Sequence, residues 1–457
     1  MKVDARTQVR FAAALVAWTS GAASILLLDD PRLRFGSFLA WMTLSVMGWL
    51  TMPSLAGWRL RLVIVIGAAL RVACVASAPA FSEDVFRHVF EGRVVWEKGP
   101  LFPFLVPPAQ APAASVSDDL LDDAWLRINH PELPTIYPPV TLVTFAMAGA
   151  LADAVGLAPL SVLKTFLVVA EALACVLIAK SLGRSAVAFL WMCPLAMFEI
   201  GREGHAEALS LLGFALAICG WRSVRPRWGH GGFAVAASTK LHGVLGLVVG
   251  ARTTRSGVLP ALLLMATAAV PAIILGTRGI ESLSAYAQRW QSGDGAFGLI
   301  LWVVRSSLDA DWVRVAGVTL TAQQLARITV AAMLFLIVAL TLRRRPSPKA
   351  VPVLTGRLLL IAVLLSPTLH PWYTLWLLPF AALEGLATGR WGFKSAMTLL
   401  IAGSPVLHYP GFLELTQGRW EEWVLPRALL HGAAWLLLWA PWRMLVRPSS
   451  GAGATSR

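Results

Sequence analysis

The chain has little charge and very little cysteine for its length. Only 14% of its 457 residues are Asp, Glu, Lys or Arg, whereas 57% are hydrophobic, and the mean hydropathy is +0.67. A water-soluble fold has no means of covering that much apolar surface, but a lipid bilayer accepts it. These proportions exclude a soluble domain and indicate an integral membrane protein.

The four cysteines exclude a disulfide framework. All of them lie inside apolar runs without paired spacing, where they behave as small hydrophobic side chains: Cys74, Cys175, Cys193 and Cys219. No histidine pair has the i, i+4 spacing beside a carboxylate that a helical metal site uses. The sequence also lacks a P-loop pattern. We therefore expect no metal and no cofactor.

The excess of basic residues does not indicate nucleic acid. The formal net charge is +14, but the arginines form short clusters between apolar runs: Arg59 and Arg61, Arg222 with Arg225 and Arg227, Arg343 to Arg345, and Arg443 with Arg447. This is the distribution of cytoplasmic loops in membrane proteins. It predicts a multi-pass protein of the cell membrane with no nucleic-acid partner. The first apolar run lacks a cleavage site and is followed by others, so we predict a retained helix.

The apolar runs predict an all-α, polytopic transmembrane fold. A spanning helix needs about 20 apolar residues. The clearest runs are 11–28, 36–52, 60–78, 161–180, 206–221, 257–276, 326–342, 372–389 and 426–442. With the shorter runs, we expect about 11 to 13 membrane helices in a single domain over residues 1–457.

The arginine clusters also predict the topology. They put the N-terminus inside, so that the large loop 79–139 and the loops 279–296, 366–373 and 408–424 all lie on the non-cytoplasmic side. The middle of the chain leaves two alternatives open. Either 140–158 is a re-entrant or interfacial helix, or a neighbouring crossing has half the usual length. Residues 228–252 predict a hairpin of two short helices with Lys240 at its tip.

Charged residues are densest between Ser82 and Gly99, directly after an apolar run. Their spacing predicts an amphipathic interfacial helix over about 83–97, with Ser82 as its N-cap. One face carries Phe86, Phe90 and Val94, and the opposite face carries Arg87, Glu91 and Lys98. A membrane protein rarely has so many ionisable groups beside the hydrocarbon without a use for them. We therefore expect the chemistry here.

Two acidic residues begin this helix, and either can serve as a general base. Acidic side chains at a helix start also stabilise the helix dipole, which is the structural alternative for Glu83 and Asp84. Their neighbours Arg87, His88, Glu91 and Arg93 share the helix and favour a functional role, and Arg87, His88 and Glu91 are candidate substrate-binding residues with Glu83. A carboxylate in that setting can take a proton from a sugar hydroxyl.

Four further segments carry candidate substrate-binding residues, each with a structural alternative. Glu199 and His205 belong to an ionisable cluster that can be a helix-entry ion-pair network. Lys240, with His242 beside it, can bind a phosphate or extend to an interface. The aromatic belt of membrane proteins accounts equally well for Trp372 and Tyr373. His370 lies between two prolines at a helix entry, which predicts that its ring faces a cavity. The remaining candidates are Tyr137, Arg289 and Trp290.

The order of these motifs resembles the C-type fold of integral-membrane glycosyltransferases. Within that fold the chain is most similar to the polyprenyl-phosphate-mannose-dependent alpha-mannosyltransferases. The resemblance covers roughly residues 60–440 through short motifs: Asp84 to Phe104, Tyr137 to Pro139, Pro194 with Glu199, His205 and Glu207, Lys240, Tyr286 with Trp290, and His370 to Tyr373. The chain departs from the pattern at Leu101 to Phe104, where relatives have an Asn-Pro turn, and at Glu91 or Glu207, where they have Asp. These departures leave the sugar and the acceptor open.

The resemblance implies one inverting displacement. It implies Asp84 as the general base, Lys240 with an arginine such as Arg87 or Arg289 on the lipid phosphate, and His370 with Tyr373 orienting the donor. A lipid phosphate is a good leaving group, so no general acid is needed. The implied partners are a polyprenyl-phosphate sugar donor, a glycan or glycolipid acceptor, and membrane lipids. The active site is expected on the non-cytoplasmic face.

Two alternatives remain at the level of the sequence. One is a transporter or flippase of lipid-linked sugars, which broken helices and charges at membrane depth also suit. The other is a transferase of the same fold that uses another sugar or a protein acceptor. The amphipathic loop 79–139 favours a transferase, because transport gives no reason for aligned acidic and basic groups there.

Overall fold

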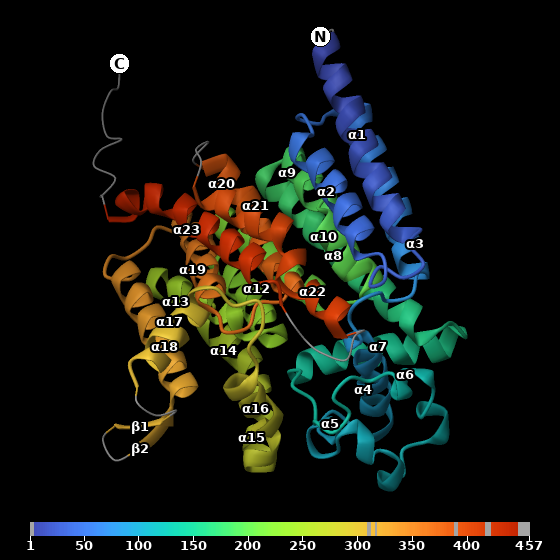
Figure 1. The fold of residues 1–457 in the computed structure, drawn as a ribbon, viewed down its shortest axis with the longest axis vertical. Coiled ribbons are helices and arrows are strands. Elements are labelled where there is room, and N and C mark those ends of the chain that lie inside the picture. The colour runs from blue at the N-terminus through green and yellow to red at the C-terminus, as the bar shows by residue number, and fades with distance from the viewer. Residues whose placement is uncertain (1–3, 309–311, 316–317, 388–391, 416–421, 447–457) are drawn as a thin grey trace.

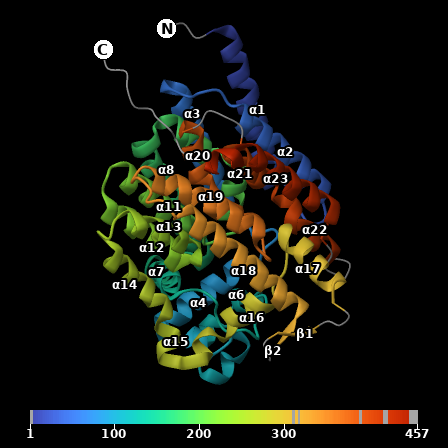
Figure 2. The ribbon, with the colours of Figure 1, turned by 90° about the vertical axis from the view of Figure 1, so that its left-hand side faces the viewer.

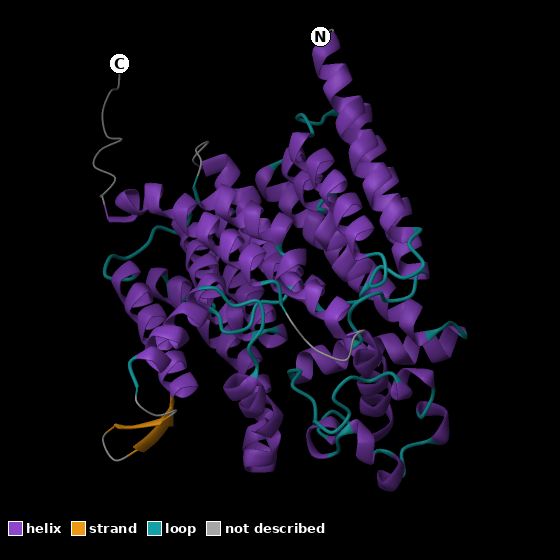
Figure 3. Ribbon diagram, in the orientation of Figure 1, coloured by secondary structure: helices purple, strands orange, loops and turns teal. Residues whose placement is uncertain are grey.

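The computed structural model describes residues 4–308, 312–315, 318–387, 392–415 and 422–446. Helices make up most of this part of the chain, as the purple ribbon of Figure 3 shows. Two short strands, β1 (Trp312–Val315) and β2 (Val318–Thr321), pair antiparallel with Trp312 opposite Thr321. The all-α prediction is confirmed.

The first part of the chain forms three long helices and then a group of short elements. The long helices are α1 (Ala5–Leu26), α2 (Phe35–Thr51) and α3 (Gly57–Ala76). After them come α4 (Asp84–Lys98), α5 (Phe102–Leu105), 3-10 turns η1 (Pro108–Gln110), η2 (Pro112–Ala114) and η3 (Asp118–Leu120), α6 (Asp123–Leu126) and α7 (Pro139–Val155).

The middle of the chain contains a broken span and a helical hairpin. Its elements are α8 (Pro159–Leu182), α9 (Arg184–Trp191), α10 (Pro194–Ala196), the π-helical η4 (Met197–Arg202), α11 (Glu207–Arg222), α12 (Pro226–Thr239), η5 (Leu241–Gly243) and α13 (Val244–Thr253). A run of short helices follows as α14 (Val258–Ala266), η6 (Thr267–Ala269), α15 (Val270–Leu275), η7 (Gly276–Ile280) and α16 (Glu281–Arg289).

The last part returns to membrane-type helices. They are α17 (Ala296–Ser306), α18 (Ala322–Thr341), α19 (Ala350–Leu365), η8 (Pro371–Leu377), α20 (Leu378–Ala387), α21 (Phe393–Gly403), α22 (Pro405–Leu415) and α23 (Val424–Val446). A wide apolar core joins the helices of all three parts.

Four helical segments are long and apolar enough to cross a membrane: α1, α8, the run Val258–Arg289 and α18. The bent pair formed by α9 with Pro194–Arg202 adds a fifth candidate span. Six shorter apolar helices accompany them within the described residues. The structure therefore agrees with an integral membrane protein, and the larger count of 11 to 13 spans stays a prediction.

The two ends of the bundle differ in what they carry. Figures 1 and 2 show α4 to α6, α16 and the β1–β2 hairpin at one end, which we call the α4 end. The start of α1 and helix α9 lie at the opposite end, which we call the α9 end. The loops 79–139, 279–296 and 366–373, predicted from the charge pattern to share one side, are joined by direct contacts at the α4 end.

A buried lysine decides between the alternatives for residues 140–158. Lys164, on the second turn of α8, donates hydrogen bonds to the carbonyls of Cys74 and Ser77, at 3.0 and 2.7 Å. The end of α3 and the start of α8 therefore lie at the same depth. The chain between them leaves and re-enters the bundle at the α4 end, where α7 packs against α4. Helix α7 is accordingly not an extra crossing.

The predicted hairpin around Lys240 is confirmed. Lys240 has an extended backbone conformation between α12 and η5, and it ends α12. Helix α12 packs closely on α11, because glycines on both helices let the backbones approach. A Cβ added at Gly232 would lie 2.3 Å from the backbone nitrogen of Ala217. This contact fixes the depth at which the hairpin tip stands.

Helix α4 begins at Asp84, and the expectation that Ser82 is its N-cap is wrong. Glu83 holds the N-cap position, while the Ser82 hydroxyl accepts a hydrogen bond from the Asp84 N–H one residue further. The face with Arg87 and Glu91 is buried, as is the apolar face. A loop that follows in the sequence covers this face and satisfies its polar groups, which a helical-period argument does not anticipate.

The close approach of α11 and α12 yields a test with an adjacent control. We expect Gly232→Ala to lower the melting temperature of the purified protein, because overpacking typically costs about 1–3 kcal/mol. Gly231→Ala should be neutral or stabilising, since a Cβ there meets no atom within 4 Å and alanine favours the helix. Thermal unfolding of both variants in the same detergent is the measurement. Equal melting temperatures would show that α11 and α12 move apart without loss of stability, which would contradict the prediction.

Candidate functional site

The turn that leads into α4 is held by buried charged groups. We call residues 77–83 the α3–α4 turn. Glu203, at the end of the broken span, accepts hydrogen bonds from three consecutive backbone N–H groups, those of Ala80, Phe81 and Ser82, at 2.8–2.9 Å. The carbonyls of the turn are bonded as well, to Arg32, Lys164 and Arg202. Seven backbone groups of the turn therefore have a charged partner, which fixes where Asp84 stands.

Asp84 is the first residue of α4, and its side chain is 27% exposed. Its Oδ1 accepts a hydrogen bond from the Asn129 side chain at 2.8 Å, and its Oδ2 lies 3.9 Å from His205 Nε2. The other ring nitrogen of His205 is 2.8 Å from the carboxylate of Glu199. Glu199 also accepts a hydrogen bond from the Tyr409 hydroxyl. Asp84 thus combines a fixed position with partial exposure, which a general base needs.

Aromatic rings form the wall behind Asp84. The ring of His205 stacks on Trp372, with centroids 3.9 Å apart, and Trp372 stacks on His370 at 4.6 Å. His370 in turn contacts the ring of His408. The structure therefore brings together Glu199, His205 and the His370 motif, which are three of the segments with candidate residues. The expectation that His370 presents its ring to a cavity is wrong, because the ring is buried in this stack.

A cavity of about 370 Å³ lies within the bundle beside this wall. It is bounded by the α12–α13 hairpin, α16, α18, η8 and the segment just before α7. Its lining is mostly apolar, and its polar or aromatic side chains include Tyr137, Lys240, His242, Tyr286, Arg327 and Tyr373. Ligand cavities of proteins usually have volumes of about 300–1,000 Å³ and a few convergent polar groups, so this cavity is of the expected kind.

Lys240 is a cation of the cavity lining. Its ammonium lies 3.3 Å from Glu207 and within 5.5 Å of the rings of Tyr137 and Tyr373. The hydroxyls of Tyr373 and Tyr286 are 2.8 Å apart. Such a lysine, surrounded by rings and one carboxylate at membrane depth, is suited to bind an anion.

His88 and Tyr137 connect Asp84 to the cavity. His88 lies one helical turn after Asp84 on the same face of α4, and its Nε2 is 2.8 Å from the hydroxyl of Tyr137, which lines the cavity. Burial lowers the pKa of His88 to about 3, so the ring is neutral near pH 7. A neutral imidazole positions the tyrosine without adding charge.

The acidic and basic side chains further along α4 hold the loop together. Arg87 donates to the carbonyls of Asn129, His130 and Leu133 and pairs with Glu91 at 3.1 Å. Glu91 also accepts a hydrogen bond from Thr135. Burial raises the pKa of Glu91, and the neighbouring Arg87 opposes that effect. The structural role of Arg87 and Glu91 therefore explains their presence without the contact with substrate that was predicted for them.

The other sequence candidates are distributed around this centre. Glu83 is 43% exposed and lies 3.9 Å from Arg32 rather than in the cavity. Arg289 is exposed at the end of α16, while Trp290 stacks on Tyr286. The ring of His242 lies against Trp376, at 3.7 Å between centroids. Arg289 thus lies apart from the cavity lining, and Tyr286 with His242 belongs to it.

Arg327 is a cavity residue that the sequence reading missed. It lies on α18, lines the cavity and donates one hydrogen bond to the carbonyl of Trp290 at 2.8 Å. Among the described residues, its buried Nε has no hydrogen-bond partner. A signal existed in the sequence, since Arg327 is the single charged residue between Ala322 and Thr341. Intramembrane arginines are functional candidates by default.

A second polar network was also missed. The Ser292 hydroxyl lies 2.8 Å from His408 Nδ1 and donates to Glu422, which pairs with Arg427. The backbone of Ser292 pairs with the segment 367–369. This network connects the loop after α16 to the start of η8. It therefore fixes the position of Trp290 relative to Tyr373.

Across the described ranges, no group of three or more His, Cys, Asp or Glu side chains is arranged to hold a metal ion. Comparisons with protein-family models, with curated proteins and with solved structures give no match for this chain. The functional proposal therefore rests on the arrangement of side chains and on the motifs of the sequence.

Glu203 offers a test of how the site is held. We expect Glu203→Gln to speed amide hydrogen exchange at residues 80–82 by about tenfold or more, because hydrogen bonds to a charged group contribute about 1.5–3 kcal/mol each. An amide keeps the size of the side chain but turns a donor toward backbone N–H groups. Glu83→Gln, which changes a half-exposed carboxylate next to the turn, is the matched control. Exchange that stays slow in both variants would contradict the role of Glu203.

Proposed function

We propose that the chain is a membrane glycosyltransferase of the C-type fold. It moves a hexose, with mannose indicated by the resemblance, from a polyprenyl-phosphate donor to a glycan or glycolipid acceptor on the non-cytoplasmic face of the cell membrane. One observation carries the proposal: a fixed, part-exposed carboxylate, Asp84, is connected through His88 and Tyr137 to an apolar cavity whose lining includes two cations, Lys240 and Arg327.

The cavity chemistry fits a lipid-linked donor. Lys240 and Arg327 suit the phosphate, and apolar residues of the lining, such as Ile280 and Leu283, suit the first isoprene units. Charge-assisted bonds to a leaving phosphate are worth more in such a water-poor site than in water. Arg327 takes the role that the resemblance gives to an arginine, because it lies in the cavity lining and Arg87 and Arg289 do not.

The carboxylate fits the second half of the reaction. Asp84 accepts the proton of the acceptor hydroxyl while the hydroxyl oxygen bonds to the anomeric carbon. The bond between that carbon and the phosphate oxygen breaks, and the electron pair leaves with the polyprenyl phosphate. His205, held by Glu199, and Asn129 orient the carboxylate. Tyr373, Tyr286 and Trp290 form a surface on which a sugar ring can stack.

The decisive assay uses purified protein in proteoliposomes with labelled polyprenyl-phosphate-mannose and a membrane glycolipid extract as acceptor. We expect acceptor-dependent release of polyprenyl phosphate in wild type. We expect Asp84→Asn to lower turnover by about 100-fold to 10,000-fold, because an amide cannot take a proton. Glu83→Gln, the neighbouring carboxylate, should keep most of the activity.

Other outcomes of this assay would contradict the proposal. Full turnover in Asp84→Asn would remove Asp84 from the role of base. Movement of intact donor across the membrane without release of lipid phosphate would instead identify a flippase of lipid-linked sugars.

The phosphate site has its own prediction. We expect Lys240→Met and Arg327→Met each to weaken binding of polyprenyl phosphate by about tenfold or more, because each removes a charge-assisted contact. Arg289→Met, at the exposed end of α16, is the control and should bind normally. Equilibrium binding of the lipid is the measurement.

A second variant keeps this test interpretable. Lys240→Met leaves the buried carboxylate of Glu207 unpaired, which is itself destabilising. The double variant Lys240→Met, Glu207→Gln removes both charges and should fold while binding remains weak. Normal lipid affinity in the double variant and in Arg327→Met would overturn the assignment of the cavity.

A further inference from the structure

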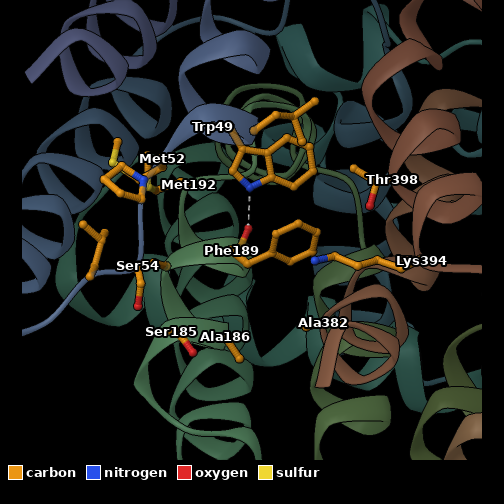
Figure 4. A pocket seen from close by; sticks show the side chains of 15 residues that line it. Trp49, Met52, Ser54, Ser185, Ala186, Phe189, Met192, Ala382, Lys394 and Thr398 are labelled. Atoms are coloured by element: carbon orange, nitrogen blue, oxygen red, sulfur yellow. Dashed lines mark hydrogen bonds between the residues drawn. The ribbon is translucent and has the colours of Figure 1, made fainter. Parts of the chain in front are cut away.

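A second cavity lies at the α9 end, opposite the Asp84 site. Its volume is about 340 Å³, and we call it the α9-end pocket. Figure 4 shows its wall, which is formed by the end of α2 and the link to α3, by α9, by α20 and by α21. None of its residues takes part in the proposed glycosyl transfer, so it needs a separate explanation.

The apolar wall of the α9-end pocket is firmly built. The indole N–H of Trp49 donates a hydrogen bond to the carbonyl of Phe189 at 2.8 Å, which is the dashed line in Figure 4. The rings of the two residues lie 4.9 Å apart. Leu50, which also lines the pocket, is 50% exposed on the outside of the bundle. The pocket therefore joins a rigid aromatic surface to an apolar outer face.

The polar groups of the pocket are one cation and several hydroxyls. Lys394 extends into the pocket, with its ammonium 5.7 Å from the centre of the Phe189 ring. The hydroxyls come from Ser54, Ser185 and Thr398. Among the described residues, the buried hydroxyl of Thr398 has no hydrogen-bond partner. This set provides one positive charge and donors for oxygen atoms, which is the chemistry that recognises a phosphate group.

The surroundings add to the positive potential and indicate the depth of the pocket. Basic side chains belong to the helix ends nearby: Arg61 is on the second turn of α3, Lys180 is on the last turn of α8, and Arg184 begins α9, which lines the pocket. Glu384, beside the lining residue Gly385 on α20, is bonded to Arg357. Trp58, on the first turn of α3 at this end, is 64% exposed, as interfacial tryptophans are. We therefore expect the pocket to stand at the level of lipid headgroups.

We propose that the α9-end pocket binds the headgroup phosphate of an anionic phospholipid from the leaflet at that end. Lys394 contacts the phosphate, the hydroxyls contact its remaining oxygens and the glycerol, and the first carbons of an acyl chain pass Trp49 and Leu50 toward the bilayer. Basic pockets between membrane helices bind lipid headgroups by this combination of charge and apolar contact. The proposal is independent of the glycosyltransferase proposal, because it concerns the other end of the molecule.

Native mass spectrometry of the purified protein tests this site. Phosphatidylglycerol is titrated against phosphatidylcholine, and we expect one phosphatidylglycerol to bind in preference. Lys394→Gln should weaken that binding by about fivefold, the effect of one lysine near a lipid surface, and Lys394→Arg should retain it. Lys180→Gln removes the same charge from an exposed position at the same end and outside the pocket, and should bind as wild type does.

Three results would overturn the proposal. Equal weakening in Lys394→Gln and Lys180→Gln would mean general surface electrostatics. Unchanged binding in Lys394→Gln would remove Lys394 from the site. Displacement of the lipid by millimolar inorganic phosphate would show that the pocket selects the free anion and not a lipid. Activity of the Asp84 site does not enter any of these measurements, so failure here leaves the glycosyltransferase proposal untouched.

Discussion

Three consecutive backbone N–H groups share the single carboxylate of Glu203, and the position of α4 depends on that contact. A buried carboxylate costs several kcal/mol unless it is bonded, and the α3–α4 turn supplies those bonds. In return, Glu203 fixes the residues immediately before Asp84. Asp84 and His88 lie on α4, and His88 contacts Tyr137 in the cavity lining. The position of α4, and with it one side of the cavity, therefore depends on Glu203 at the end of the broken span.

Charge is separated within the candidate site. Asp84 stands among polar groups with partial exposure, whereas Lys240 and Arg327 stand in a largely apolar cavity. In a medium of low dielectric constant, a cation interacts strongly with any anion that reaches it. Glu207 balances Lys240 from behind, so Arg327 contributes the net positive charge of the cavity wall. The two halves of a transfer reaction, proton removal and departure of a phosphate, thus have separate environments.

Much of the architecture was predictable because lipid imposes simple rules on sequence. Apolar length, arginine clusters and a lysine inside an apolar run are local signals, and they predicted the membrane class, the all-α fold and the break at Lys240. The covering of Arg87 and Glu91 was not predictable in this way. The partners of Arg87 are carbonyls, and the partner of Glu91 is the Thr135 hydroxyl, all 42–46 residues further along the chain. A helical period shows which residues share a face but not what covers it.

The second polar network escaped for the same reason. Ser292 lies 116 residues before His408 and 130 residues before Glu422 in the chain, and each looks ordinary in its own segment. Arg327 is a different case, because its isolation inside an apolar run is visible in the sequence. Reading every intramembrane charge as a functional candidate would have found it.

The link between Glu203 and the α3–α4 turn also has a consequence for biogenesis. Membrane insertion proceeds from the N-terminus, and about 120 residues separate Ala80 from its acceptor. During synthesis, the segment with Asp84 is therefore complete well before the broken span that fixes it has been made. The region of the candidate base therefore acquires its final shape only after Glu203 has been made, although it comes early in the chain. A substitution that displaces Glu203 would leave Asp84 without a defined position, although α1 to α3 come before the broken span in the chain.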